Sequence, residues 1–100
     1  DQIVSVEGVD AVFIGPADLA ITFGMAPAAA PMPGVHADAI EAVRRAASAA
    51  GLAVGISCPD AESALRLAAS GYTFLPIGVD THWVASTARA ALAAVRGAGY

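Results

Sequence analysis

Residues 10–19 decide the fold and read Asp10-Ala11-Val12-Phe13-Ile14-Gly15-Pro16-Ala17-Asp18-Leu19. The apolar run ends at a Gly-Pro pair, and the first charged side chain beyond it is Asp18. A continuously apolar run is typical of a strand buried on both faces of a parallel sheet. Parallel α/β proteins carry their chemistry at the carboxyl ends of such strands. The stretch therefore predicts a buried strand with a carboxylate at its functional end, where it could bind a hard divalent cation.

The composition indicates part of an ordered domain. The 100 residues are 57% hydrophobic and only 14% charged, which excludes a disordered segment. The chain opens Asp1-Gln2-Ile3, without Met or a charged signal-type start, so we expect a piece of a longer protein. No apolar run approaches the roughly 20 residues of a membrane helix, and we expect no membrane partner.

Charge and cysteine content narrow the partners and the compartment. The net charge is −4, and the basic residues are five scattered arginines, so nucleic-acid binding is excluded. A single cysteine, Cys58, rules out an internal disulfide and fits a reducing cytoplasm. We expect Cys58 to be a small apolar filler at a strand-to-helix junction, because no cationic neighbour is apparent that would activate a thiol.

Apolar strands and amphipathic helices alternate along the chain. Strands are predicted over 11–14, 52–56 and 73–77, and helices over 39–50, 59–70 and 82–95. This alternation predicts a parallel sheet with right-handed crossovers. Pro76 lies inside the third strand, where we expect a bulge or an unpaired partner. The proline-rich residues 23–34 are expected to form a long ordered loop or a short irregular helix.

Polar residues near the predicted helix starts are interpreted as caps. Asp38 is expected to cap the helix over 39–50, with Glu41 completing a capping-box-like pair. Asp80 or Thr81 is expected to cap the last helix, and we prefer this role for Asp80 over a second site carboxylate. The apolar stripe of the helix over 39–50 is expected to comprise Ile40, Val43 and Ala47, and that of the middle helix Ala61, Leu65 and Ala68.

None of the histidines, the tryptophan or the arginines is assigned to a catalytic or binding site. His36 and His82 are each expected to be a surface or capping histidine rather than a catalytic base. Trp83 is interpreted as a packing anchor or a subunit contact. All five arginines lie on helical segments, and none is assigned to a site.

Three motifs together resemble one enzyme family. Residues 6–19 followed by Gly24, residues 50–56 and residues 71–81 are similar to signatures of the HpcH/HpaI aldolase family. Members are class II, metal-dependent 2-oxo-acid aldolases, such as 4-hydroxy-2-oxoheptanedioate aldolase and 2-dehydro-3-deoxyglucarate aldolase. The first motif is fairly specific, and the spacing of all three agrees with the family over nearly the whole chain.

The resemblance implies an α/β fold, namely a (β/α)₈ barrel. The three predicted strands would be the sixth, seventh and eighth, so residues 1–100 would be the carboxyl-terminal part of one barrel domain and incomplete alone. The family's other metal ligand (a glutamate), its carboxylate-binding arginine and its proton-transfer histidine lie on earlier strands, outside this chain. No catalytic residue is therefore assigned here, and the fragment alone is expected to be inactive.

The resemblance also implies a site at the end of the first strand. Asp18 would bind a divalent metal (Mg²⁺, Mn²⁺ or Co²⁺), and the backbone of Gly15, Pro16 and Ala17 would hold the substrate carboxylate. Proline has no N–H, so the donors would be Ala17 and its neighbours. Without the resemblance, Asp18 could simply be the N-cap of a turn starting at Leu19, and Gly15-Pro16 an ordinary tight turn.

The implied activity is cleavage of a 4-hydroxy-2-oxo acid to pyruvate and an aldehyde through a metal-stabilised enolate. The family commonly assembles as a homo-oligomer, a hexamer, whose last helix can pack on a neighbour. One alternative is a CoA-thioester lyase of the citryl or malyl type. Another is a truncated, non-catalytic half-barrel.

Overall fold

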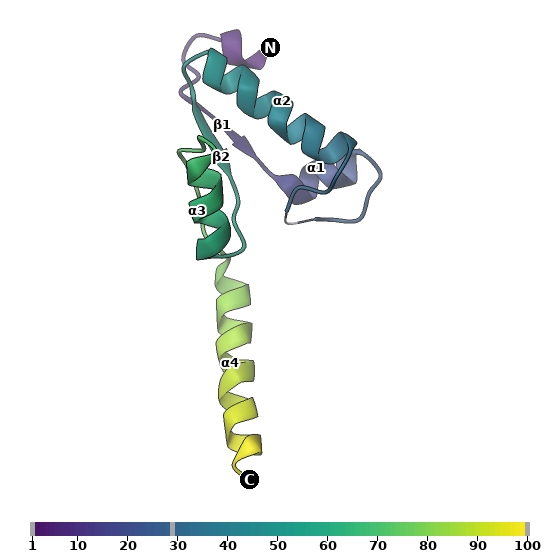
Figure 1. Ribbon diagram of the computed structural model, residues 1–100, viewed down its shortest axis with the longest axis vertical. Helices are drawn as coiled ribbons and strands as arrows, with labels where there is room; N and C mark the ends of the chain where they lie inside the picture. Colours follow the sequence, from purple (N-terminus) through teal and green to yellow (C-terminus); the bar gives the residue numbers. More distant parts are fainter. Residues whose placement is uncertain (1, 29, 100) are drawn as a thin grey trace.

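The computed structural model describes residues 2–28 and 30–99 (Figure 1). Its elements in chain order are η1 (Ile3–Ser5), β1 (Ala11–Ile14), α1 (Pro16–Thr22), α2 (Val35–Ala49), β2 (Ala53–Ile56), α3 (Ala61–Ala69) and α4 (Asp80–Gly97). Among the described residues of 23–34 there is no helix or strand, which confirms the predicted loop; Ala29 lies outside the described residues.

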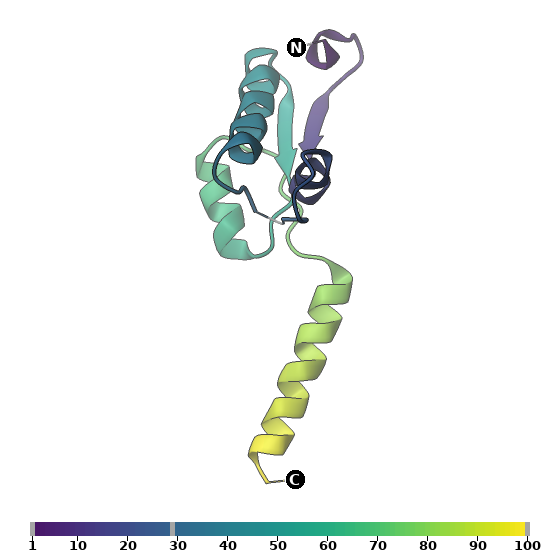
Figure 2. The same ribbon diagram turned by 90° about the vertical axis from the view of Figure 1, so that its right-hand side faces the viewer.

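The two strands pair in parallel, as the alternation predicted. The register joins Ala11 to Ala53 and Ile14 to Ile56. The crossover between the strands contains α2, which packs against both of them, and Figure 2 shows α2 and α3 on the same side of the strands. The buried core between these layers comprises Ile14, Ile40, Ala47, Val54, Ile56 and Tyr72.

The opposite face of the strands is apolar but uncovered in this chain. Phe13 on β1 is 49% exposed, and Phe74 is 53% exposed. Their ring centroids lie 5.6 Å apart with a 57° tilt, and both rings lie against Gly55 of β2. The strands thus carry apolar side chains on both faces, which is the pattern of a sheet meant to be buried on both sides.

The prediction of a complete third strand over 73–77 is wrong. This segment follows β2 in parallel but makes only two isolated bridges, Gly55 to Phe74 and Cys58 to Ile77. Backbone N–H groups of Ile56 and Cys58 donate to the carbonyls of Phe74 and Pro76, at 3.1 and 2.9 Å. The predicted disruption at Pro76 is present, since the ladder is interrupted between the two bridges.

The cause of the interruption is chemical. A regular parallel ladder would have residue 76 donate to the carbonyl of Ile56, but proline has no N–H. The Sγ–H of Cys58 instead donates to this carbonyl, at 3.5 Å. Cys58 is 3% exposed, which confirms its predicted role as a buried apolar filler between β2 and α3.

Helix α2 begins earlier than predicted, and Asp38 is not its N-cap. Gly34 holds the N-cap position with φ +91°, a conformation that glycine adopts without strain, and Asp38 falls in the first turn. Glu41 makes no capping box, because its carboxylate accepts two hydrogen bonds from Arg44 at 2.6 and 2.7 Å.

Helix α3 begins at Ala61, two residues later than predicted, and its inner face is rotated from the predicted one. Asp60 is its N-cap and accepts a hydrogen bond from the Ser63 N–H at 2.7 Å. The predicted stripe of 61, 65 and 68 is wrong: Leu65 is 73% exposed, whereas Ala64 is buried and Leu67 packs on the core. In an alanine-rich helix several stripes have helical spacing, so spacing alone does not identify the side that meets the sheet.

Helix α4 extends away from the rest of the molecule (Figure 1). The described chain measures 60 × 27 × 22 Å with a radius of gyration of 17.3 Å, against about 13 Å for a compact domain of this length. No residue between Asp80 and Gly97 is buried. Asp80 is not the N-cap, which is Val79, but its carboxylate accepts the Thr81 N–H at 2.7 Å. None of the helices in the described part of the chain has both the length and the hydropathy of a membrane-spanning segment.

Candidate functional site at the β1–α1 corner

The end of β1 turns directly into α1. Gly15 is the N-cap of this helix, Pro16 is its first residue, and the Leu19 N–H donates to the Gly15 carbonyl at 2.9 Å. Proline suits this position because the first helical N–H would have no partner in the helix. The alternative interpretation of Asp18 as an N-cap is therefore wrong, since Gly15 occupies that position and Asp18 is the third helical residue.

The Asp18 side chain is exposed and turns toward Gly15, the residue that follows the strand. A Cβ placed on Gly15 would lie 2.7 Å from Oδ2 of Asp18, so the carboxylate occupies the space beside this glycine. The ion pairs among the described residues join Glu41 to Arg44 and Arg45, and Glu62 to Arg66. Within that part of the chain, Asp18 therefore has no ion-pair partner.

This carboxylate fits a metal as one ligand of several. Carboxylate oxygen is the donor that Mg²⁺ and Mn²⁺ prefer. Within residues 2–28 and 30–99, no group of three or more His, Cys, Asp or Glu side chains could hold a metal ion. A complete metal site would therefore need further ligands from outside these residues.

The corner also offers backbone donors. Pro16 is buried, and Gly15 and Ala17 are partly buried. The N–H groups of Ala17 and Asp18 have no acceptor within the helix, because intrahelical bonding begins with Leu19. The structure thus brings Gly15, Pro16, Ala17 and Asp18 together on one short turn, at the carboxyl end of the strand.

His36 is the residue that the sequence interpretation missed. It was expected to be a surface or capping histidine, but it is fully buried, with an exposed fraction of 0%. Its Nδ1 accepts the Met32 N–H at 3.0 Å, and its Nε2 lies 2.9 Å from the Pro16 carbonyl oxygen. One signal could have found it: extending the apolar stripe that starts at Ile40 back by one turn reaches position 36.

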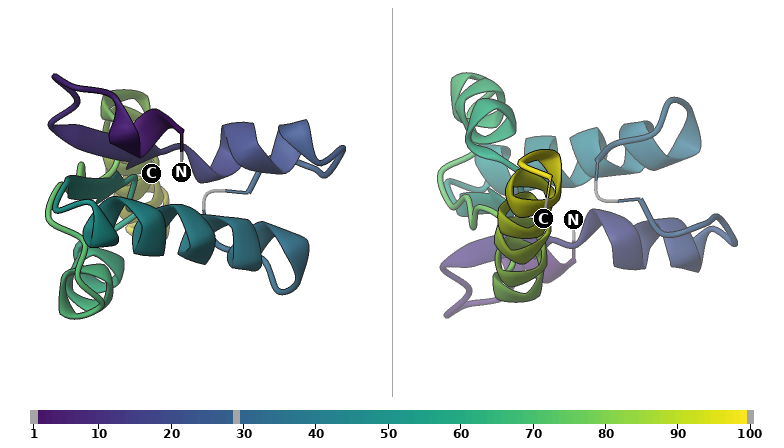
Figure 3. Two further views of the ribbon diagram at one scale, coloured as in Figure 1. Left: turned by 90° about the horizontal axis from the view of Figure 1, so that it is seen from above. Right: turned by 90° about the horizontal axis from the view of Figure 1, so that it is seen from below.

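His36 joins two helices at the corner. Helices α1 and α2 lie side by side in both views of Figure 3, and α2 carries the histidine that bonds to the first residue of α1. His82 behaves as predicted: it is exposed. Trp83 is 54% exposed and lies against Gly78, which makes a local packing contact among the described residues.

A cavity of about 300 Å³ lies at the same end of the sheet, beyond β2. It is lined by Ser57, Cys58, Pro59, Gly78, Val79 and His82. Burial, and secondarily the charge of Asp60, raises the pKa of the Cys58 thiol. This thiol therefore remains neutral near pH 7 and is no candidate nucleophile.

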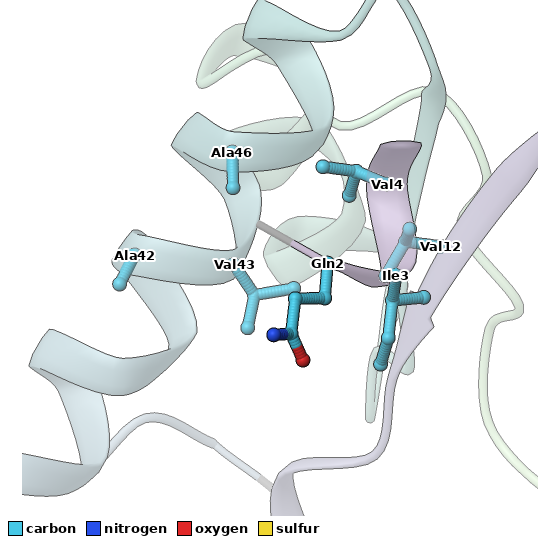
Figure 4. A pocket seen from close by; sticks show the side chains of 7 residues that line it. All are labelled: Gln2, Ile3, Val4, Val12, Ala42, Val43 and Ala46. Carbon is cyan, nitrogen blue, oxygen red and sulfur yellow. The ribbon is translucent and has the colours of Figure 1, made fainter. Parts of the chain in front are cut away.

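A larger cavity of about 650 Å³ lies between η1, β1 and α2 (Figure 4). Its lining is Gln2, Ile3, Val4, Val12, Ala42, Val43 and Ala46. The only polar side chain among these is an amide, which cannot replace the charged groups that metal binding or acid–base chemistry requires. This cavity is therefore an apolar hollow beside β1 and no candidate for a catalytic or metal-binding site.

Comparisons with known proteins point to one family. The sequence profile of the HpcH/HpaI aldolase/citrate lyase family matches residues 1–87. A hydroxypyruvate/pyruvate aldolase of Rhizorhabdus wittichii is 40% identical over 96 residues, covering 96% of this chain and 38% of the relative. A 4-hydroxy-2-oxovalerate aldolase of Rhodococcus jostii is 39% identical over 87 residues, covering 85% of this chain and 32% of the relative.

A solved structure supports the same relationship. The crystal structure of an HpcH/HpaI aldolase/citrate lyase family protein from Burkholderia cenocepacia superposes with a TM-score of 0.84 at 34% identity. The match covers 95% of this chain and 36% of that protein. The chain thus spans about a third of the length of the relatives it matches.

Proposed function

Because the chain belongs to the HpcH/HpaI aldolase/citrate lyase family, we propose that it is the carboxyl-terminal part of a metal-dependent aldolase. The complete enzyme would cleave a 4-hydroxy-2-oxo acid to pyruvate and an aldehyde. Relatives named hydroxypyruvate/pyruvate aldolase and 4-hydroxy-2-oxovalerate aldolase support this reaction class. The chain spans about a third of those relatives, so it would be one part of a longer domain, and its place at the carboxyl-terminal end follows from the family resemblance.

We further propose that β1, β2 and the segment over 73–77 are the sixth to eighth strands of a (β/α)₈ barrel. The exposed Phe13 and Phe74 rings support this, because the face opposite α2 and α3 would become the barrel interior. The apolar cavity beside β1 would be covered by preceding residues. We accordingly expect residues 1–100 alone to show no cooperative thermal transition in circular dichroism, whereas the full-length protein unfolds cooperatively.

In this proposal Asp18 holds the metal, together with ligands from preceding strands. When bound, Mg²⁺, Mn²⁺ or Co²⁺ supplies a Lewis acid for the negative charge that carbon–carbon cleavage leaves on the oxo acid. The corner at Gly15, Pro16 and Ala17 receives the carboxylate of the 2-oxo acid, with the Ala17 N–H as a donor. Gly15 has no side chain, which keeps the space beside the strand free for the Asp18 carboxylate.

The observation that carries the proposal is the exposed Asp18 carboxylate at the carboxyl end of β1. The test is pyruvate release by the full-length protein, with and without a chelator, for wild type and Asp18→Ala. We expect the substitution to abolish metal-dependent release while the circular dichroism spectrum is retained. Asp38→Ala is a matched control, because Asp38 is also an exposed first-turn carboxylate but belongs to α2, which does not directly follow a strand. Unchanged turnover in Asp18→Ala would reject the role.

A CoA-thioester lyase is the second candidate, because the family description includes citrate lyase. Release of a CoA thioester from citryl-CoA or malyl-CoA, in the absence of activity on 4-hydroxy-2-oxo acids, would favour it. A non-catalytic half-barrel would be favoured if the full-length protein lacked both activities.

We also propose that α4 packs on another copy of the protein in a homo-oligomer, a hexamer by the family resemblance. Exposed apolar side chains on this helix support a contact: Trp83, Val84, Leu92 and Val95 are each about half exposed or more. Analytical ultracentrifugation of the full-length protein tests the proposal. We expect Trp83→Ala to shift the distribution toward smaller species, and a wild-type monomer would contradict it.

A further inference from the structure

We propose that His36 is a positioning residue that orients the Pro16–Ala17 peptide at the β1–α1 corner. Through this peptide it would align the backbone donor that receives the carboxylate of the oxo acid. The inference rests on the proposed function and adds a residue on α2 that touches neither the metal nor the substrate.

The hydrogen bonds of His36 indicate its tautomer. Nδ1 accepts the Met32 N–H at 3.0 Å, so the ring proton lies on Nε2. Nε2–H then donates to the Pro16 carbonyl oxygen at 2.9 Å. Both nitrogens are used and the ring is fully buried, so this imidazole is arranged to hold backbone rather than to transfer a proton.

Because the peptide unit is planar, the hydrogen bond from His36 to the Pro16 carbonyl also sets the direction of the Ala17 N–H. The carbonyl of residue 16 and the N–H of residue 17 belong to one planar unit and point in opposite directions. Holding the Pro16 carbonyl toward His36 therefore points the Ala17 N–H away from α2. The ring of Pro16 fixes its φ, and the Leu19 N–H bond to Gly15 closes the turn, so the peptide has little remaining freedom.

A purely structural role would depend on burial and volume alone. The positioning role instead depends on one ring nitrogen, the Nε2 that faces Pro16. Glutamine places its amide near the position of Nε2 and can donate to the Pro16 carbonyl. Asparagine places its amide near Nδ1 and can only serve Met32. The pair His36→Gln and His36→Asn therefore separates the two functions of the ring.

The experiment uses the full-length protein. Calorimetric titration with Mn²⁺, and then with pyruvate in the presence of Mn²⁺, is combined with thermal unfolding. We expect His36→Asn to weaken pyruvate binding about tenfold or more, as when a hydrogen bond to a charged group is lost. We expect His36→Gln to bind pyruvate nearly as wild type although its Tm is lowered, and Mn²⁺ affinity to change little in both.

Each outcome decides the inference. Equal weakening of pyruvate binding in both variants, or none in His36→Asn, would leave His36 a packing residue and overturn the inference alone. If His36→Asn does not fold, His36→Gln decides: retained pyruvate affinity with a lowered Tm supports positioning, and a tenfold loss overturns it. Failure of the wild-type protein to bind Mn²⁺ and pyruvate would overturn the proposed function, and this inference with it.

Discussion

The carboxylate of Asp18 occupies the place that a side chain on Gly15 would take: a Cβ built at position 15 lies 2.7 Å from Oδ2. The backbone of Gly15, with φ −96° and ψ 97°, is open to other residues. The backbone conformation therefore does not require glycine at position 15, but the position of the Asp18 carboxylate leaves no room for a side chain there. The small residue at the end of β1 is part of how Asp18 is placed.

Gly15→Ala should weaken metal binding without unfolding the protein. The added methyl would push the carboxylate out of its position, and an off-rotamer side chain costs about 0.5–1.5 kcal/mol. We expect a fall of about two- to tenfold in Mn²⁺ affinity in calorimetric titration of the full-length protein. The Tm should change little, because the Asp18 side chain is exposed and can rotate.

Gly97→Ala is the matched control for adding a methyl group. A Cβ at Gly97 meets no atom within 4 Å, so this variant should keep wild-type Mn²⁺ affinity. Wild-type affinity in Gly15→Ala as well would show that the carboxylate position is unimportant for the metal.

Gly55→Ala should destabilise the sheet. A Cβ there would lie 2.7 Å from the Phe13 ring, 2.9 Å from the Phe74 ring and 3.0 Å from the Phe74 carbonyl oxygen. Because the last contact is with backbone, rotation of side chains cannot relieve all of it. Overpacking of this kind costs about 1–3 kcal/mol, so the urea midpoint of the full-length protein should fall.

The double variant Phe13→Leu/Gly55→Ala tests this cause. Removing one ring should recover part of the loss relative to Phe13→Leu alone, since the two changes share a contact. Additive losses in the double variant would mean that the clash with the Phe13 ring is not responsible.

The central unit of β1, α2 and β2 could be predicted from the sequence alone. The apolar runs of β1 and β2 and the stripe through Ile40 and Ala47 identify buried faces directly, and the structure confirms the parallel pairing. The sequence was also sufficient to mark Pro76 as a break, because the missing N–H is a local property of the residue. It did not show that the segment over 73–77 would be reduced to two bridges, which depends on long-range pairing with β2.

The remaining differences have similar origins. Asp38 was preferred as a cap by residue type, but the chain entered α2 earlier, at Gly34, where positive φ favours glycine. Among the site residues, Asp18 could be predicted from its place after a strand. His36 was harder, because its role depends on a contact with Pro16, twenty residues away in the sequence.

Glu41→Gln should lower stability in a pH-dependent way. The hydrogen bonds from Arg44, and then the charges of Arg44 and Arg45, hold the pKa of Glu41 below its ordinary value, although partial burial opposes this. A carboxyl group with a lowered folded-state pKa stabilises the fold above its unfolded pKa and loses this contribution as the pH falls through the folded pKa. The urea midpoint should therefore be lower than wild type at pH 7, and the difference should narrow below pH 4.5.

Glu62→Gln provides the comparison within the same chain. Its partner Arg66 is also 2.6 Å away, but both side chains are more exposed than those of the Glu41 pair. Exposed pairs contribute less, so its effect at pH 7 should be smaller. An equal or larger effect of Glu62→Gln would contradict the assignment of stability to the Glu41–Arg44 pair.

Cys58 should resist alkylation in the folded protein and limit stability at alkaline pH. Burial raises the pKa of its thiol, so little reactive thiolate forms at pH 8. An acid with a raised folded-state pKa contributes stability below its unfolded pKa, and this contribution is lost as the pH rises through the folded value. Mass spectrometry after iodoacetamide treatment should show much slower labelling in buffer than in urea, and the urea midpoint should fall above pH 9.0.

Cys58→Ser and Cys58→Ala separate the thiol from its hydrogen bond. Serine keeps a donor for the Ile56 carbonyl, which Pro76 cannot supply, whereas alanine removes it. Leaving a buried carbonyl without a partner costs about 1–3 kcal/mol, so alanine should be the less stable of the two variants at pH 8. Because neither variant has a thiol, the urea midpoint of both should fall less above pH 9.0 than that of the wild type. Equal stability of Cys58→Ala and Cys58→Ser would show that the Sγ–H bond does not compensate for the interrupted ladder. Labelling of Cys58 by iodoacetamide as fast in the folded protein as in urea would show that the folded protein does not keep the thiol protonated.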